Sequence, residues 1–306
     1  MSYNQITLGS VAEKNKNNSI NNIPSEGGEN VYDGGESKSE AKNIAAKHNI
    51  PEQYLDMEFK TPTEEIKLPS GGIFYPNKKD TVTIKYLTAE EDDILFSAEL
   101  IKSGRVLDVL LEKSVMDKDL RPDQMVSGDR NYLLIEMRKT GLGSEYSPGE
   151  IYCNSCREVY SPVIDLDKLK AKGVEIEPNS EGEYDVMLPV MKMNIKFRLL
   201  TGQDEKRLNK LAESGSSKSG GIKIKKVITE KYLMQIMEVN GNRDKGYIKK
   251  FISAMPMKDS MFFREYLKRI EPGLDLSYEF ECPNCGEIEV RDIPITPKLY
   301  YPDLDL

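Results

Sequence analysis

Histidine and tryptophan are nearly missing from this 306-residue sequence, which contains one histidine, His48, and no tryptophan. His48 lies in a polar N-terminal stretch. The rest of the chain therefore cannot form a Ser-His-Asp triad, a Cys-His dyad or a His-ligated catalytic metal site. The sequence also lacks the G-x-x-x-x-G-K-[ST] and G-x-G-x-x-G phosphate-binding motifs. These absences exclude the common hydrolase and nucleotide-binding classes, and we expect a protein that is not an enzyme.

Long apolar runs and an excess of positive charge are missing too. No run of eighteen apolar residues occurs, so we expect no membrane-spanning segment. The first eighteen residues lack a basic stretch followed by an apolar one, so we expect no secretory signal and synthesis in a reducing cytoplasm. The net charge of −8 and the pI of about 5.1 argue against a partner with a phosphate backbone, so we expect no nucleic acid.

Cysteine is scarce, and its four copies form two Cys-x-x-Cys pairs, "CNSC" at 153–156 and "CPNC" at 282–285. In a reducing compartment such pairs indicate a metal more often than a disulfide. Two thiolates bind one side of a zinc ion, and a second pair completes the tetrahedron, as in a zinc ribbon. The sequence predicts one structural Zn²⁺ per chain with the ligands Cys153, Cys156, Cys282 and Cys285. Two isolated buried pairs, a redox dithiol and a lost metal remain open as alternatives.

The residue after each pair differs between the two motifs. Gly286 follows the second pair and can adopt the positive φ that turns backbone N–H groups toward sulfur. Arg157 occupies the same place after the first pair, where a left-handed conformation costs about 1–2 kcal/mol. Its positive charge would offset part of the net charge of a four-thiolate zinc site.

Residues 1–60 differ in composition from the rest, being rich in Asn, Ser, Gly, Lys and Glu. Such a segment buries too little apolar area to offset its ordering entropy, so we expect a disordered N-terminal tail. Within it, residues 39–59 could form a short helix that is broken before Pro51. A passive tail and a tether that becomes ordered on a partner are both open interpretations.

The remaining chain contains the same order of features twice. A Leu-Pro turn, an alternating strand, a Leu-Thr step, an acidic helix start, a helix and a Cys-x-x-Cys hairpin occur in 62–172 and again in 183–298. Thr88 and Thr201 are 113 residues apart, and Cys153 and Cys282 are 129 apart, a difference that an insertion near 213–227 explains. We therefore predict an α+β protein made by internal duplication, with 173–182 as linker. Chance similarity is the alternative.

The acidic stretch Glu90, Glu91, Asp92 and Asp93 is the one candidate for acid–base catalysis by carboxylates. It follows Thr88 directly, and Thr88 with Glu91 has the spacing of a capping box, so we interpret it as the first turn of a helix over 89–104. The C-terminal segment 299–306 is rich in Leu and Tyr and preceded by prolines, which predicts an extended strap on a neighbouring protein. A frayed end is the alternative.

The segments "LPSGGIFYP", "YLTAEEDDIL", "SGDRNYLLIEMRKTGLGSEYSPGEIYCNSC" and "LPVMKMNIKFRLLTGQDEKRL" together resemble the baseplate hub proteins of T-even-type contractile-tailed phages. The resemblance covers residues 66–290. It implies a structural or assembly subunit of the baseplate hub, located in the virion tail, made in the host cytoplasm and bound to other baseplate proteins. A homo-oligomer within the hub stays open. The family has no catalytic residues that can be carried over to this chain.

Two other functions compete with this one. A zinc-ribbon adaptor for nucleic acid, in transcription or replication, would use the same four cysteines but requires a basic surface that the composition does not favour. A cell-wall hydrolase based on carboxylates would fit the tip of an injection machine. The absence of tryptophan and of histidine outside the N-terminal tail argues against it.

Overall fold

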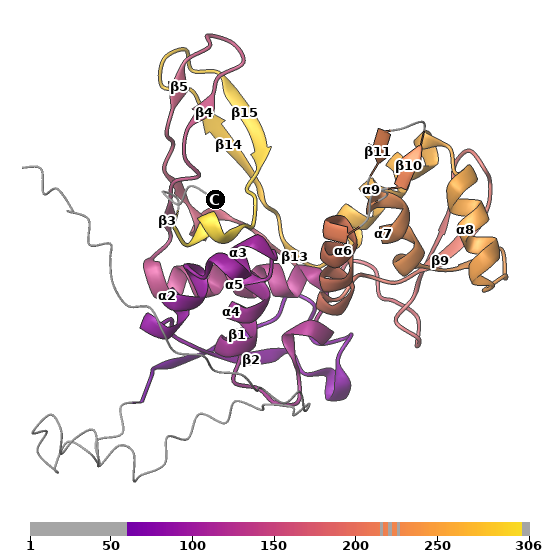
Figure 1. Cartoon of the computed structure of the whole chain (residues 1–306), viewed down its shortest axis with the longest axis horizontal. Coiled ribbons are helices and arrows are strands. Elements are labelled where there is room, and N and C mark those ends of the chain that lie inside the picture. Colours follow the sequence, from indigo (N-terminus) through magenta and orange to yellow (C-terminus); the bar gives the residue numbers. More distant parts are fainter. Residues whose placement is uncertain (1–59, 215–216, 220–221, 225–226, 302–306) are drawn as a thin grey trace, which may run out of the picture. The chain divides into compact units, whose positions relative to one another are not determined.

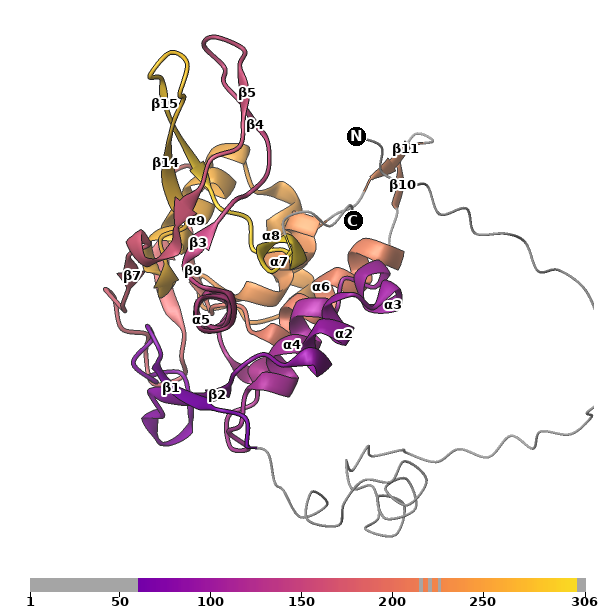
Figure 2. The same ribbon diagram turned by 90° about the vertical axis from the view of Figure 1, so that its left-hand side faces the viewer.

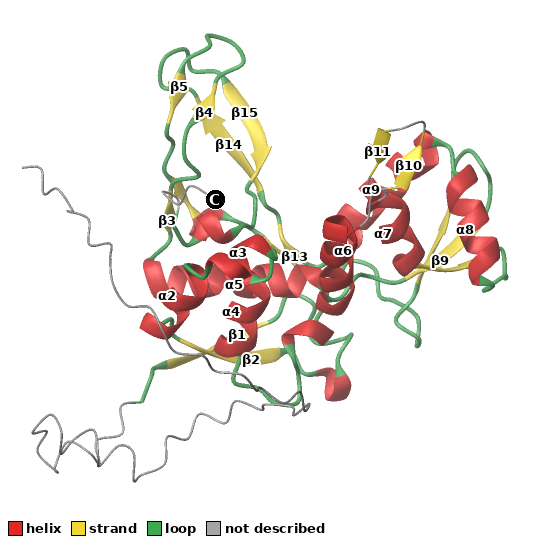
Figure 3. Ribbon diagram, in the orientation of Figure 1, coloured by secondary structure: helices red, strands yellow, loops and turns green. Residues whose placement is uncertain are grey.

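Small antiparallel sheets and short helices alternate along the chain in the computed structural model (Figures 1 and 3). The structure describes residues 60–214, 217–219, 222–224 and 227–301. The predicted N-terminal tail, the helix expected within it and the last five residues of the C-terminal strap therefore lie outside the described residues. The mixture of helices and strands agrees with the predicted α+β class.

The first half opens with a hairpin and is built around one long helix. Its strands are β1 (Thr63–Lys67), β2 (Thr81–Lys85), β3 (Glu145–Tyr146), β4 (Ile151–Tyr152), β5 (Val159–Tyr160), β6 (Ile164–Asp165) and β7 (Ala171–Lys172). Its α-helices are α2 (Ala89–Leu95), α3 (Ala98–Lys102), α4 (Val106–Ser114) and α5 (Ser127–Leu142). Short 3₁₀ turns are η2 (Pro76–Lys78), η3 (Pro122–Gln124) and η4 (Leu166–Lys168).

The second half also opens with a hairpin. Its strands are β8 (Tyr184–Met187), β9 (Asn194–Phe197), β10 (Ser217–Ser219), β11 (Ile222–Ile224), β12 (Ile236–Val239), β13 (Gly273–Leu274), β14 (Ser277–Glu281) and β15 (Ile288–Asp292). Its helices are α6 (Gly202–Ser214), α7 (Val227–Gln235), α8 (Lys245–Ala254), α9 (Met257–Ile270) and the 3₁₀ turn η5 (Pro297–Leu299). Strand β12 pairs with β9 to make a three-stranded sheet, in the order β12-β9-β8.

The β1–β2 hairpin forms because β-branched residues alternate along β2 and two glycines close the turn. Val82 and Ile84 are buried, and Val82 is the partner of Ile66 in the antiparallel register. Gly71 and Gly72 have φ angles of 59° and 75°, which glycine adopts without a steric cost. The Leu-Pro turn predicted at the start of the first half, at Leu68 and Pro69, is therefore confirmed.

Helix α2 begins as predicted but ends earlier. Thr88 and Glu91 form the reciprocal capping box, with the Thr88 N–H donating to Glu91 at 2.9 Å. The single helix expected over 89–104 is wrong, because α2 ends at Leu95 and Ser97 caps a separate helix, α3. The Phe96 ring lies 4.6 Å from the Tyr301 ring, a contact with the end of the chain that the local sequence does not encode.

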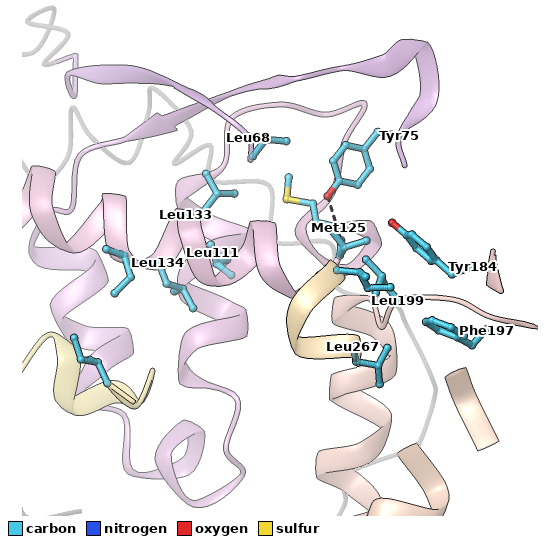
Figure 4. Close-up of a cluster of buried hydrophobic side chains, with 14 of the residues drawn as sticks. Leu68, Tyr75, Leu111, Met125, Leu133, Leu134, Tyr184, Phe197, Leu199 and Leu267 are labelled. Carbon is cyan, nitrogen blue, oxygen red and sulfur yellow. Dashed lines mark hydrogen bonds between the residues drawn. The ribbon is translucent and has the colours of Figure 1, made fainter. Parts of the chain in front are cut away.

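One hydrophobic core runs through both halves (Figure 4). Leu133 of α5 and Phe197 of β9 are fully buried members of the same cluster. Phe197 meets the Phe263 ring edge-on, with ring centroids 4.9 Å apart and planes at 83°. Edge-to-face packing of this kind adds about 0.5–1.5 kcal/mol beyond the area buried. The packing of buried side chains from both halves in one cluster therefore joins the two halves.

The segment after β15 returns to the first half. Tyr300 is buried and donates from its hydroxyl to the Leu134 carbonyl of α5 at 2.9 Å. Arg138 of α5 donates from Nε to the Leu299 carbonyl at 2.9 Å. The apolar groups of 299–301, which we expected to cover a neighbouring protein, thus pack on their own chain. None of the described helices is long and apolar enough to cross a membrane.

Candidate metal centre

Two hairpins that are far apart in sequence stand side by side (Figures 1 and 2). In the first, β4 pairs with β5, with Tyr152 opposite Val159. In the second, β14 pairs with β15, with Glu281 opposite Ile288. Each Cys-x-x-Cys motif makes the turn of its hairpin, so the strands carry both motifs to the same place.

The two turns have the same backbone geometry. The Cys153 N–H bonds to the Glu158 carbonyl at 2.9 Å, and the Cys282 N–H bonds to the Glu287 carbonyl at 2.8 Å. The residue after each pair donates back to the first cysteine's carbonyl, at 3.0 Å from Arg157 and 2.9 Å from Gly286. Arg157 and Gly286 are 129 positions apart, the same spacing as Cys153 and Cys282, so they occupy equivalent places in the two turns.

The left-handed conformation expected after each pair is confirmed. Gly286 has a φ of 72°, and Arg157 has a φ of 67°. A non-glycine residue in this region costs about 1–2 kcal/mol, so the fold around the first motif compensates for strain at Arg157.

The four sulfur atoms gather at one point. All lie within 4.8 Å of one another, with Cys153 Sγ 3.7 Å from Cys285 Sγ and Cys156 Sγ 3.6 Å from Cys282 Sγ. A tetrahedron with bonds of about 2.3 Å to zinc has sulfur–sulfur edges of roughly 3.8 Å. The four cysteines therefore fit one tetrahedral metal ion, and the alternative of two isolated pairs is wrong.

A disulfide does not explain this cluster. All four cysteines are free, and the two short sulfur–sulfur distances exceed the bond length of about 2.05 Å. Cys153 and Cys282 are buried, whereas Cys156 is partly exposed and Cys285 is exposed. Each hairpin thus contributes one inner and one outer sulfur.

The pKa values of two thiols show the electrostatic need for a cation. The Glu158 N–H points at the Cys156 sulfur and lowers the pKa of that thiol to about 6. The Glu287 N–H acts on Cys285 in the same way, but the neighbouring sulfurs, Cys156 first, raise the pKa of Cys285 to about 12. With its pKa raised in this way, the Cys285 thiol would ionise at neutral pH only beside a compensating positive charge, which a bound metal ion would supply.

Polar contacts beside the cysteines join the hairpins a second time. The Asn154 N–H donates to Glu289 Oε1 at 3.0 Å, and Arg291 Nη2 donates to the Tyr152 carbonyl at 2.6 Å. Arg291 Nε also donates to Glu289 Oε2 at 2.9 Å, which orients both side chains. Glu289 and Arg291 were not predicted from the sequence. Their only sequence signal is that they lie two residues apart on β15, which places both side chains on the same face of the strand.

Four protein ligands fill a tetrahedral site completely. No position would remain for a water molecule or a substrate, so the arrangement suits a structural metal and not a catalytic one. The ion would fasten β4–β5 to β14–β15, two hairpins that are each too small to be stable alone.

The acidic residues once considered for acid–base chemistry are used in the fold. Glu91 is buried, and its carboxylate accepts hydrogen bonds from the N–H and hydroxyl of Thr88 at 2.9 and 2.7 Å. Lys85 Nζ lies 2.7 Å from its other oxygen. Asp92 accepts a hydrogen bond from the Tyr301 hydroxyl.

Comparison with known families identifies one match. The family model described as "T4 bacteriophage base plate protein" matches residues 60–294, which is nearly the whole described region. Comparisons with curated proteins and with solved structures found no significant match. The chain therefore belongs to the family of T4 bacteriophage base plate proteins, which supports a structural role in the baseplate of a phage virion tail, among other baseplate proteins.

Proposed function

We propose that this chain is a structural subunit of the baseplate hub and that one Zn²⁺ bound by Cys153, Cys156, Cys282 and Cys285 fastens its two halves. The observation that carries the proposal is the meeting of four sulfurs from distant hairpins in a chain of the base plate family. A subunit at the centre of a contracting tail must hold its shape while its neighbours move. A metal staple across the two halves resists such loads without a large core.

We further propose that the two halves arose by duplication. Both run from hairpin to capped helix to long helix to cysteine hairpin. The capping groups support this most directly: Thr201 donates its N–H to Asp204 at 3.0 Å, as Thr88 does to Glu91 at 2.9 Å. A basic side chain three residues before each threonine pairs with the same carboxylate, Arg198 in one half and Lys85 in the other. All three positions repeat at the same spacing of 113 residues.

Zinc is the proposed metal because of the ligand type. Four thiolates in a tetrahedron select zinc or an iron centre among the common biological metals. Zinc has no redox chemistry and no preferred geometry of its own, so it suits a purely mechanical role.

We propose a non-enzymatic role, which the use of the polar side chains supports. The cysteines leave no open metal position, and Glu91 and Asp92 are bound within the fold. Without histidine outside the N-terminal tail, general acid–base chemistry would depend on other carboxylates.

Copurification with phage particles tests the hub assignment. Lysates of infected cells would be separated into free protein, isolated hubs, baseplates and complete tails, and the chain quantified in each by mass spectrometry. We expect a fixed stoichiometry in all three assemblies. Presence in free protein only would reduce the role to an assembly factor, and presence in baseplates but not in isolated hubs would place it outside the hub.

A zinc-ribbon adaptor for nucleic acid is separated from this proposal by a gel-shift titration. The hub assignment predicts no binding to DNA or RNA at 150 mM salt. Tight binding that weakens steeply with added salt would favour the adaptor instead.

A further inference from the structure

One contact between the two halves has no reciprocal counterpart among the described residues. Residues 125–128, at the start of α5, enter a groove of the second half formed by 200–202 and 272–273. The Ser127 N–H donates to the Leu200 carbonyl at 2.9 Å, and the Gly202 N–H donates to the Met125 carbonyl at 3.0 Å. We call 125–128 the bound insert and its groove the bound groove.

This contact is tight. Met125 is fully buried, and Ser127 is 7% exposed. Gly128 passes the Pro272 carbonyl so closely that a Cβ on it would lie 1.6 Å from that oxygen. The first half thus supplies the insert, and the second half supplies the groove.

Both partners of this contact have a counterpart elsewhere in the chain. Residues 255–258, "MPMK", start α9 as 125–128, "MVSG", start α5, and a buried aspartate follows each segment directly. The start of α2, at 87–89, corresponds to the start of α6, at 200–202. The end of α5, at 142–143, corresponds to the segment just after α9, at 272–273. We call 255–258 the free insert, and 87–89 with 142–143 the free groove.

Both free elements are more exposed than their bound counterparts. Met257 is 78% exposed, whereas the corresponding Ser127 is 7% exposed. Leu142 is 47% exposed, whereas the corresponding Pro272 is buried. At the position of Ser127 the free insert has the apolar Met257. An apolar side chain that is exposed in one half, where the corresponding residue of the other half is buried, indicates a missing partner.

The backbone groups of the free elements are unpaired and complementary. Within the described part of the chain, the Leu87 carbonyl and the Ala89 N–H have no hydrogen-bond partner, although they correspond to the Leu200 carbonyl and the Gly202 N–H. The Met257 N–H and the Met255 carbonyl are likewise unpaired among the described residues. Each side lacks the donor and the acceptor that the other offers.

We propose that a second copy of this chain fills these positions, with the free insert of one copy entering the free groove of the next. The Met257 N–H would donate to the Leu87 carbonyl, and the Ala89 N–H to the Met255 carbonyl. The inference rests on the proposed duplication, which makes the internal contact the template for the external one. Such a contact is head-to-tail, so it builds a closed ring or an open row and not a two-fold dimer.

One difference between the external and the internal contact affects how closely the copies can approach. Lys258 stands where Gly128 passes the Pro272 carbonyl, so the free insert cannot approach as closely. Gly143 keeps the opposite wall of the groove free of a side chain. The Lys258 ammonium group would meet the acidic first turn of α2, where Glu90 is exposed, which gives the wider contact a favourable charge pairing.

The cysteine cluster does not contribute to this association. All four sulfurs come from one chain. The first cysteine of each pair lies next to the second cysteine of the other pair, as Cys153 does to Cys285 and Cys282 to Cys156. Only a small contact joins the copies, and interfaces below about 1,200 Å² are weak in solution. We therefore expect association at high concentration.

Complementation between two blocked variants of the full chain tests the proposal. Met257→Glu blocks the free insert, and Ala89→Trp blocks the free groove; both residues are exposed, so both variants should fold. In sedimentation velocity from about 10 to 500 µM, we expect wild type to form species larger than a dimer. Each variant alone should remain monomeric, and an equimolar mixture should form a dimer and nothing larger.

Val290→Glu is the matched control, since it places the same charge on another highly exposed apolar residue, in β15. It should associate as wild type does. A wild type that stays monomeric at 500 µM would overturn the proposal, as would blocked variants that still associate or a mixture that stays monomeric. Metal content and incorporation into tails, measured on the same variants, report the proposed function separately, so either idea can fail alone.

Discussion

Asp259 makes in the second half the contact that Asp129 makes in the first. Both carboxylates are fully buried at the third residue of a long helix, and both accept backbone N–H groups from a hairpin turn. Asp129 accepts from Ser70 at 3.0 Å, and Asp259 accepts from Val190 and Met191 at 2.7 and 2.9 Å. In each half a buried aspartate side chain therefore fixes the hairpin on the helix that leads to the cysteine motif.

Replacing either aspartate by asparagine should destabilise the protein. In Asp259→Asn an amide NH₂ would face a backbone N–H, leaving one buried donor unpaired at a cost of about 1–3 kcal/mol. Asp129→Asn should cost less, because burial raises the pKa of Asp129 and the neutral amide removes a desolvated charge. Urea unfolding of both variants measures the difference, with the exposed Asp185→Asn as control. A neutral Asp259→Asn would contradict this role.

The strain at Arg157 gives a second prediction. Arg157→Gly should stabilise the protein by about 0.5–1 kcal/mol, because glycine accepts the positive φ without a steric cost. Arg157→Ala removes the same charge but keeps the strained conformation, so it should give no gain. Thermal unfolding of the two variants in the presence of zinc separates backbone strain from charge. Equal effects of glycine and alanine would show that charge decides.

The junction between the halves is sensitive to one methyl group. Gly128→Ala places a Cβ against the Pro272 carbonyl, and the backbone must move to relieve the clash. We expect a loss of about 2–3 kcal/mol, in the range of overpacked cores. Gly173→Ala is the control, since its Cβ would lie at an ordinary 3.7 Å from the Pro69 carbonyl. A Gly128→Ala variant as stable as the control would mean that the halves are not packed this closely.

The local features of the fold could be predicted from the sequence, because their causes lie within a few residues. The cap at Thr88, the turn at Gly71 and the two cysteine turns follow from side chains that bond to their own neighbourhood. The distant pairing of the cysteines was also predictable, because a metal needs four ligands and the chain has four cysteines.

The features that were missed depend on residues far apart in the chain. The break after α2 has no proline or glycine to announce it, and its Phe96 meets Tyr301 from the other end of the described region. Arg130 pairs with the buried Asp108 of its own half and with the partly exposed Glu205 of the other half, and no short motif could indicate these contacts. Such contacts are set by packing, and packing is decided by the whole core.

The pH dependence of stability should contain a contribution from Glu91. Burial alone would raise the pKa of Glu91, but Lys85 and the Thr88 cap lower it overall below its ordinary value of 4.5. A lowered pKa in the folded state stabilises the protein above about pH 4.5, and the contribution is lost as the pH falls through the folded-state pKa. Glu91→Gln should therefore be less stable than wild type at pH 7.

Comparing wild type with Glu91→Gln at each pH cancels any effect of acid on the proposed metal site, because both proteins have the same four cysteines. The gap in unfolding free energy between wild type and Glu91→Gln should narrow as the pH falls from 5 to 3. Asp204→Asn should behave in the same way, because the pKa of Asp204 is also lowered overall: burial raises it, but Arg198 and the Thr201 cap outweigh that effect. A gap that stays constant with pH would exclude ionised Glu91 as its source.

The metal centre gives the prediction on which the proposed function depends most. Native mass spectrometry of the full chain should show about one zinc ion, because the four sulfurs fit one tetrahedral site. Cys282→Ser removes one of the two buried ligands. It should lose the metal and lower the Tm by on the order of 10 °C, since the hairpins have little core of their own. Ser155→Ala, a non-ligand in the first cysteine turn, should change neither value. If wild type contained no metal and its four thiols all reacted freely with an alkylating agent, the proposed zinc link between the hairpins would be wrong. The hairpins would then be joined by the contacts of Asn154, Glu289 and Arg291.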